Sequence, residues 1–217
     1  MSCVLRLKKG DRLTAFDGES KEYECKIIAL SEKKAELEIF KTKRAQFLEE
    51  VRITLACAIP KKAKMDFIVE KVTELGVHTI IPLHTHRTIV DLEGERARNR
   101  LRRWQAIAKE TSKQCARIEL PKIEAVTEFK DIVMRAKEYD MALIPHLGIK
   151  NVYLKDIVLK NSPKSVIVFI GPEGDFSEAE IRQAKENGCQ GVSLGALTLK
   201  VDTAAIAVAA FLRFFYG

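Results

Sequence analysis

Two hydrophobic patterns divide the chain into a short first part and a longer second part. In the first part, apolar and polar residues alternate over residues 4–7, 12–16, 23–30 and 35–40, with Gly-Asp and Asp-Gly pairs between the runs. This alternation is typical of strands with one buried face, and such pairs are typical of tight turns between antiparallel strands. We therefore predict a small antiparallel β-sheet or barrel over residues 1–48.

The second part alternates apolar runs with helical patterns. Continuous apolar runs rich in β-branched residues are typical of strands buried on both faces of a parallel sheet. Apolar residues at every third or fourth position between these runs indicate amphipathic helices. We therefore predict an α/β domain over residues 49–217, with a mostly parallel sheet and helices on both faces. The predicted strands are 51–59, 79–83, 140–145, 166–170 and a short run after Gly188, and the predicted helices are 61–75, 96–115, one capped at Thr127, 151–159, 177–188 and 202–216.

Residues 166–204 carry the most specific local signals. The strand ends at a Gly-Pro-Glu-Gly sequence, residues 171–174, whose glycines permit a sharp turn, positive φ and close approach to a ligand. Ser177 followed by Glu180 is a capping box, so a helix is expected to begin there and to end at Gly188. Open α/β sheets bind ligands at loops that follow buried parallel strands. We therefore expect a ligand site at this edge of the sheet.

Two motifs in this region resemble the cofactor loops of the SPOUT methyltransferases. They are GPEGDFSEAE at residues 171–180 and LGALTLKVDTA at residues 194–204. Together with KVTELGV at residues 71–77 and the stretch from Gln114 to Arg117 with Pro121, they are most similar to the family that methylates N3 of a uridine in 16S ribosomal RNA (RsmE-like). The similarity spans nearly the whole chain.

The resemblance implies a more specific architecture and set of partners. SPOUT enzymes tie their carboxyl-terminal portion, here from about residue 140, into a trefoil knot that binds S-adenosylmethionine. They usually act as homodimers whose active site uses both subunits. The implied substrate is 16S ribosomal RNA of the small ribosomal subunit, and residues 1–48 are implied to form a PUA-like RNA-binding module. This module begins later than in the family, so we expect its barrel to be incomplete or to be completed by another strand.

The chemistry of the implied reaction suggests which residues take part. Methyl transfer from a sulfonium is an in-line displacement, which requires positioning and charge stabilisation and needs no metal or covalent intermediate. The N3 proton of uracil must leave before N3 can attack, so a cation that stabilises the anion or a carboxylate that accepts the proton assists the reaction. The catalytic candidates are Lys200, Asp202 and Arg117, with Glu173 as a further carboxylate. The predicted cofactor-binding residues are Ile144, Pro145, His146, Ile170, Gly171, Gly174, Leu194, Gly195 and Leu199.

Four positions in the two motifs depart from the family pattern. The family usually has arginine at the positions of Leu197 and Lys200, glutamate at that of Asp202 and glycine at that of Asp175. Leu197 removes a charge, Lys200 lacks the planar fork of arginine, and Asp202 has a shorter reach than glutamate. Asp175 is compatible with positive φ. The competing structural interpretations are that Asp202 caps the last helix and that Lys200 faces solvent.

The net charge of +7 is concentrated in one segment. Residues 96–117 hold eight basic residues and one acidic residue, whereas the rest of the chain is balanced. Such a cluster is typical of polyanion binding, and a solvated helix face is the alternative. We predict that Arg96, Arg100 and Arg103 bind RNA. Trp104 lies in the apolar stripe of the same predicted helix, which favours core packing over stacking on a base.

Composition and spacing argue against several other classes of protein. No apolar run approaches a membrane span and the amino end lacks a signal peptide, so we expect a cytoplasmic protein without membrane contact. Five cysteines without a C-x-x-C pair predict neither disulfides nor a zinc site. His84 and His86 have no third ligand in register, so we predict no metal site. The signature motifs of nucleotide-binding loops and of hydrolases do not occur.

Two alternatives to uridine-N3 methylation stay open. The same fold can methylate another RNA position, such as a ribose hydroxyl. The residues at positions 197, 200 and 202 are also compatible with a non-catalytic protein that binds ribosomal RNA.

Overall fold

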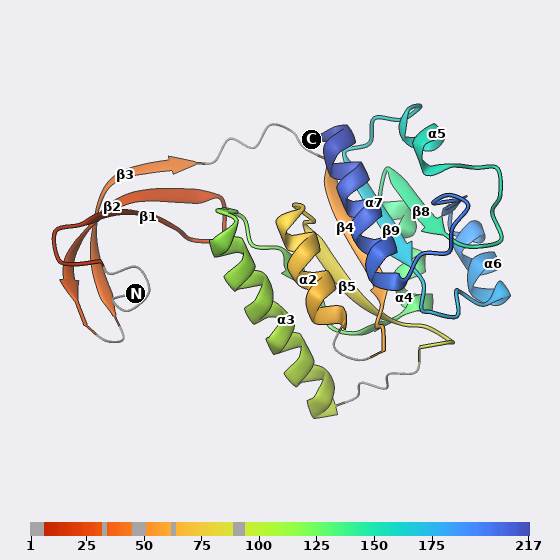
Figure 1. Cartoon of the computed structure of the whole chain (residues 1–217), viewed down its shortest axis with the longest axis horizontal. Coiled ribbons are helices and arrows are strands. Elements are labelled where there is room, and N and C mark those ends of the chain that lie inside the picture. The colour runs from red at the N-terminus through yellow and green to blue at the C-terminus, as the bar shows by residue number, and fades with distance from the viewer. Residues whose placement is uncertain (1–6, 32–33, 45–50, 62–63, 89–93) are drawn as a thin grey trace. The chain divides into compact units, whose positions relative to one another are not determined.

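The computed structural model describes residues 7–31, 34–44, 51–61, 64–88 and 94–217. The chain forms two compact units, which are coloured along the sequence in Figure 1. One unit comprises Met1–Leu48 with Ala116–Leu120, and the other comprises Glu49–Cys115 with Pro121–Gly217. The short segment of residues 116–120 therefore belongs with the amino-terminal unit.

The first unit is a three-stranded antiparallel sheet. Strands β1 (Arg12–Phe16), β2 (Lys21–Leu30) and β3 (Ala35–Arg44) pair in the order β1-β2-β3. In the β1–β2 turn, Oδ1 of Asp17 accepts hydrogen bonds from the backbone N–H of Glu19 at 2.7 Å and of Lys21 at 3.1 Å. The predicted antiparallel strands are confirmed, except that most of the one at 4–7 lies outside the described residues.

The second unit is built on a seven-stranded parallel sheet. Its order is β10-β8-β9-β4-β5-β6, with β7 also paired to β5, and every pair is parallel. The four longest strands are buried along most of their length, as predicted for strands covered on both faces. The strands are β4 (Arg52–Ala58), β5 (Thr79–His84), β6 (Lys122–Ile123), β7 (Thr127–Glu128), β8 (Met141–Pro145), β9 (Ser165–Ile170) and β10 (Gln190–Val192).

Helices cover both faces of this sheet and enclose two cores. Because side chains alternate along a strand, β9 sends Val166 and Val168 into one core and Ile167 and Phe169 into the other. The first core contains residues of α2 (Lys64–Glu74), α3 (Gly94–Gln114), α5 (Leu154–Val158) and α7 (Val201–Tyr216). The second core contains residues of α4 (Phe129–Val133), the 3-10 helix η1 (Met134–Glu138) and α6 (Glu178–Glu186).

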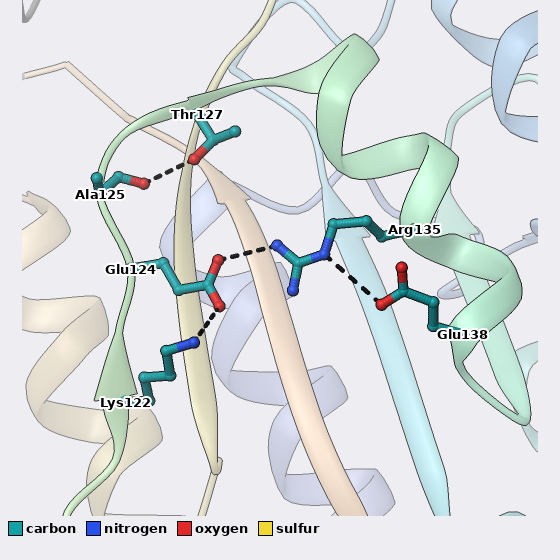
Figure 2. A network of polar contacts seen from close by, with 6 residues as sticks. All are labelled: Lys122, Glu124, Ala125, Thr127, Arg135 and Glu138. Atoms are coloured by element: carbon teal, nitrogen blue, oxygen red, sulfur yellow. Dashed lines mark hydrogen bonds and ion pairs between the residues drawn. The ribbon is translucent and has the colours of Figure 1, made fainter.

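The prediction of a helix capped at Thr127 is wrong. Thr127 and Glu128 form β7 beside Leu83 and His84, and the hydroxyl of Thr127 donates to the carbonyl of Ala125 at 2.9 Å (Figure 2). The helix begins only at Phe129, without a side-chain cap. Thr127 and Glu128, which the local pattern assigned to the helix, form a strand because they pair with β5.

A polar network joins β6 to η1 (Figure 2). The carboxylate of Glu124 is 2.9 Å from Nζ of Lys122 and 3.0 Å from Nη1 of Arg135, and Nε of Arg135 is 3.8 Å from Glu138. Partial burial of Glu124 acts to raise its pKa, but the two cations outweigh burial, so the pKa lies below its usual range. Glu124 is therefore ionised at neutral pH and links the edge of the sheet to the helix beside it.

Candidate functional site

A cavity of about 530 Å³ lies at the carboxyl ends of β8, β9 and β10. Its walls are the loops that follow these three strands and the first turn of α7. The strands are neighbours in the order β10-β8-β9, so the loops near Gly171 and Gly195 converge although they are far apart in sequence. The two loops predicted to bind a cofactor thus enclose one hollow.

Most of the predicted cofactor residues line this hollow, and two do not. Ile144 is fully buried in the second core. Gly174 lies in the wall of a neighbouring hollow. The predicted residues in the wall of the cavity at the ends of β8, β9 and β10 are Pro145, His146, Ile170, Gly171, Leu194, Gly195 and Leu199.

Positive φ in the first loop occurs at a different residue from those predicted. Among the described residues of this loop it is found at Asp175, with φ of 61°, and not at Gly171 or Gly174. Gly171 instead permits close packing, because a Cβ there would lie 3.1 Å from the ring of Phe176. In the second loop, Gly195 has φ of 122°, a conformation that other residues rarely adopt.

Asp175 joins two walls of the cavity. Its backbone N–H donates to the carbonyl of Pro172 at 2.9 Å, which closes the turn. Its carboxylate accepts the N–H of Leu147 at 2.9 Å, in the loop after β8, and that of Phe176 at 2.8 Å. The aspartate in place of the usual glycine therefore has a structural role that its tolerance of positive φ alone did not predict.

The loop after β9 is also braced by its own helix. Ser177 and Glu180 form the predicted capping box, which is confirmed. The second carboxylate oxygen of Glu180 accepts the N–H of His86 at 2.9 Å, and the guanidinium of Arg87 donates to the carbonyl of Gly174. The segment after β5 therefore holds the Gly-Pro-Glu-Gly turn from outside.

His146 is a neutral imidazole in the cavity wall. Its Nδ1 accepts the N–H of Gly148 at 3.2 Å, so its proton lies on Nε2, and this atom is buried without a partner among the described residues. Burial, together with the charge of Lys185, lowers the pKa of His146, and the charge of Asp175 opposes this shift. The wall thus contains a buried polar atom whose hydrogen bond is unmade, a feature that a ligand or water commonly satisfies.

The catalytic candidates occupy different places. Glu173 lines the cavity, and its carboxylate accepts the N–H of Lys61 at 3.1 Å. Asp202, in the first turn of α7, lies 3.3 Å from Nζ of Lys64. Lys200 is exposed at the N-cap position of α7. Arg117 belongs to residues 116–120 of the first unit.

Lys200 is exposed, which agrees with the interpretation that it faces solvent, whereas the interpretation of Asp202 as a helix cap is wrong. Asp202 does not cap the last helix, because the N-cap is Lys200 and no side chain caps it. Cys57 lies near the carboxyl end of β4. Its pKa rises to about 12, mainly because the thiol is buried and further because the negative charges of Glu173 and Asp202 disfavour the thiolate. Glu173 and Asp202 therefore lie near the same strand end.

The chain matches the family of the RNA methyltransferase domain over residues 47–213 and that of the RNA methyltransferase PUA domain over residues 4–40. It belongs to the RNA methyltransferase family. The resemblance drawn from the sequence motifs and the predicted α/β class with a small amino-terminal β module are thereby confirmed, whereas the trefoil knot stays a prediction.

Two relatives and one solved structure carry the same name. Two proteins called "Ribosomal RNA small subunit methyltransferase E" are similar: one from Mesomycoplasma hyopneumoniae (strain 232), 32% identical over 75% of this chain and 73% of the relative, and one from Bacillus subtilis (strain 168), 26% identical over 94% and 81%. A crystal structure of the Neisseria gonorrhoeae protein of the same name, bound to S-adenosyl methionine, superposes with a TM-score of 0.86 at 31% identity and covers 100% of this chain and 88% of that one.

The basic helix of the methyltransferase domain is α3. Arg96 and Arg100 are exposed, whereas Nε of Arg103 lies 2.7 Å from Oδ2 of Asp66. Trp104 is 1% exposed and its indole N–H donates to the other oxygen of Asp66 at 3.1 Å, so core packing of Trp104 is confirmed. Two of the three predicted RNA-binding arginines are therefore more available to a ligand than the third.

Two further observations concern metal binding and membrane-spanning helices. Nδ1 of His84 lies 2.9 Å from a carboxylate oxygen of Glu128. Within the described ranges, no cluster of three or more His, Cys, Asp or Glu side chains has the geometry to hold a metal ion. None of the helices in that part of the chain is both long and apolar enough to cross a membrane.

Proposed function

We propose that this protein transfers a methyl group from S-adenosylmethionine to N3 of a uridine in 16S ribosomal RNA of the small ribosomal subunit. The observation that carries the proposal is the single cavity between the two motif loops of a chain in the RNA methyltransferase family. The name shared by the relatives and the cofactor bound in the Neisseria gonorrhoeae structure support it.

The cavity suits the cofactor in size and character. Its volume of about 530 Å³ falls within the range of small-molecule sites, about 300 to 1,000 Å³. Ile170, Leu194 and Leu199 offer an apolar surface for an adenine ring, and the loop backbones around Gly171 and Gly195 offer hydrogen-bonding groups. When bound, the cofactor supplies an electrophilic methyl group on a sulfonium.

The residues at the end of β4 suit removal of the uracil proton. Asp202 and the cavity-lining Glu173 are carboxylates that can accept the N3 proton. Lys200 and Lys64 place positive charge nearby, which stabilises a uracil anion and compensates in part for the charge missing at Leu197. Arg117 is kept in the proposal as a catalytic candidate because the stretch from Gln114 to Arg117 with Pro121 resembles the family.

A homodimer in the cytoplasm completes the proposal. The last turns of α7 leave Phe214 80% exposed and Phe215 43% exposed, so an apolar helix end is available to a second copy. Light scattering after size exclusion tests this point, since a monomer at micromolar concentration would contradict it.

The decisive experiment uses labelled cofactor and small subunits that lack the modification. Label at uridine N3 in the digested RNA is expected. Label on a ribose would favour the first alternative, and no saturable heat with the cofactor in calorimetry would favour a non-catalytic binding protein. Asp202→Asn is expected to lower the rate of transfer about 100-fold while the cofactor dissociation constant stays unchanged.

A further inference from the structure

A second hollow, of about 620 Å³, adjoins the cofactor cavity. Its walls are one face of α6, the loop after β8, residues 174–176 of the loop after β9, and Arg87 from the segment after β5. The two hollows share His146, Leu147 and Asp175. A group held in the second hollow is therefore separated from the first by little more than the loop after β8.

One face of α6 gives the second hollow its positive charge. Arg182 and Lys185 are three residues apart, so their side chains lie on the same face of the helix. Both are exposed, and neither forms an ion pair with any residue that the structure describes. Arg87 adds a third cation, and its guanidinium has donors beyond the one that binds the carbonyl of Gly174.

Two carboxylates, Asp175 and Glu178, also line the second hollow, so its three cations exceed its acidic side chains by one charge. The oxygens of Asp175 accept the N–H groups of Leu147 and Phe176. Glu178 is four residues before Arg182, a spacing at which side chains on one helix face are neighbours, and seven residues before Lys185, so the end of the hollow at Lys185 is the more positive one. An anionic group is therefore expected to bind at that end.

We propose that this second hollow binds a phosphate group of the RNA strand, next to the uridine to be methylated, through Arg182, Lys185 and Arg87. The inference rests on the proposed function, because a uridine that enters the cofactor cavity brings its own flanking phosphates within one nucleotide of it. A planar guanidinium binds a phosphate through two parallel hydrogen bonds, and a lysine adds a point charge. These contacts position the uridine relative to the methyl donor.

The test compares variants that remove or keep the charge of α6. The double variant Arg182→Gln with Lys185→Gln removes it, and Arg182→Lys with Lys185→Arg keeps it. Lys137→Gln with Lys160→Gln is the matched control, since both lysines are exposed and line neither hollow. Each protein is titrated with unmodified small ribosomal subunits between about 50 and 200 mM salt, and with S-adenosylmethionine in a calorimeter.

The glutamine pair is expected to bind small subunits about tenfold more weakly. The slope of log affinity against log salt is expected to become shallower by about one to two, because fewer counterions are released on binding when phosphate contacts are lost. Its affinity for the cofactor is expected to be unchanged. The charge-preserving pair and the lysine control are expected to keep the slope of the unaltered protein.

Two outcomes would overturn the inference. Equal subunit affinity and salt slope in the glutamine pair would mean that the second hollow contacts no RNA phosphate. Loss of cofactor binding in this pair would mean that the second hollow holds the carboxylate of the cofactor instead. Failure of the proposed function is seen separately, as absence of cofactor binding or methyl transfer in the unaltered protein, and the subunit titration can still be read in that case.

Discussion

At the scale of single residues, Asp66 shows how one carboxylate supports both the core and the basic surface. One oxygen accepts the indole N–H of buried Trp104, and the other binds the exposed guanidinium of Arg103. A buried donor left without a partner costs about 1–3 kcal/mol, whereas an exposed ion pair contributes about 1 kcal/mol or less. The bond to Trp104 is therefore the one that matters for stability.

Asp66→Ala is accordingly expected to lower the free energy of unfolding by about 2 kcal/mol, and Arg103→Gln by less than about 1 kcal/mol. Urea denaturation of the two variants measures both values. If the arginine variant proved the less stable of the two, the assignment of the indole bond as the main contribution would be wrong.

Asp175 supports a second prediction at this scale. Asp175→Ala places an alanine at positive φ and removes the acceptor for the N–H of Leu147, so we expect a loss of about 2 kcal/mol in unfolding free energy and weaker cofactor binding. Asp175→Asn is the control, since asparagine tolerates this φ and keeps one acceptor, and its loss is expected to stay below about 1 kcal/mol. Denaturation and calorimetry check the pair, and an alanine variant as stable as the aspartate would contradict it.

At the scale of elements, α6 is joined to the sheet through its first turn. Ser177→Ala removes one half of the capping box and is expected to cost about 1 kcal/mol. Glu180→Ala removes the other half and also the acceptor for the N–H of His86, so its cost is expected to be larger, about 2 kcal/mol. Thermal denaturation ranks the two, and the reverse order would show that the bond to His86 contributes nothing.

The network in Figure 2 predicts how the edge of the sheet responds to acid. The pKa of Glu124 is lowered in the folded protein, so its stabilising contribution is present above the pKa of an unfolded glutamate, about 4.3, and is lost as pH falls through the lower folded value. Glu124→Gln is therefore expected to lower the free energy of unfolding at neutral pH. Below about pH 4, the free energies of unfolding of the variant and the unaltered protein are expected to become more alike. Denaturation midpoints across pH measure this, and a constant difference would exclude Glu124 as its source.

At the scale of the whole molecule, positive charge is proposed to bind RNA phosphates at two places, on α3 and in the second hollow beside α6. Arg96 and Arg100 on α3 are expected to contact phosphates, while Arg103 is already bonded to Asp66. Replacing Arg96 and Arg100 with glutamine should weaken binding to small subunits and lower the salt slope by about one to two, and Arg103→Gln should change the slope less. Filter binding across salt measures this, and an equal effect of Arg103→Gln would mean that RNA displaces Asp66.

Local sequence patterns by themselves determine many of the helices, strands and turns of this protein. The strands at residues 52–58 and 165–170, the helices at 64–74 and 201–216 and the Ser177 capping box follow from periodicity and turn chemistry, which depend on neighbours within a few positions. The two motif loops could be placed at strand ends for the same reason. The methyltransferase family was recognisable because its motifs are short, contiguous and in a definite order.

Only the tertiary structure decided how these parts meet. Thr127 became a strand because β5 offered it backbone partners, and Asp175 became a link between loops because Leu147 lies beside it. Asp202 pairs with Lys64 across 138 positions in the chain. Such pairings depend on which distant strands and helices become neighbours, and a short stretch of sequence carries no information about its partners in space.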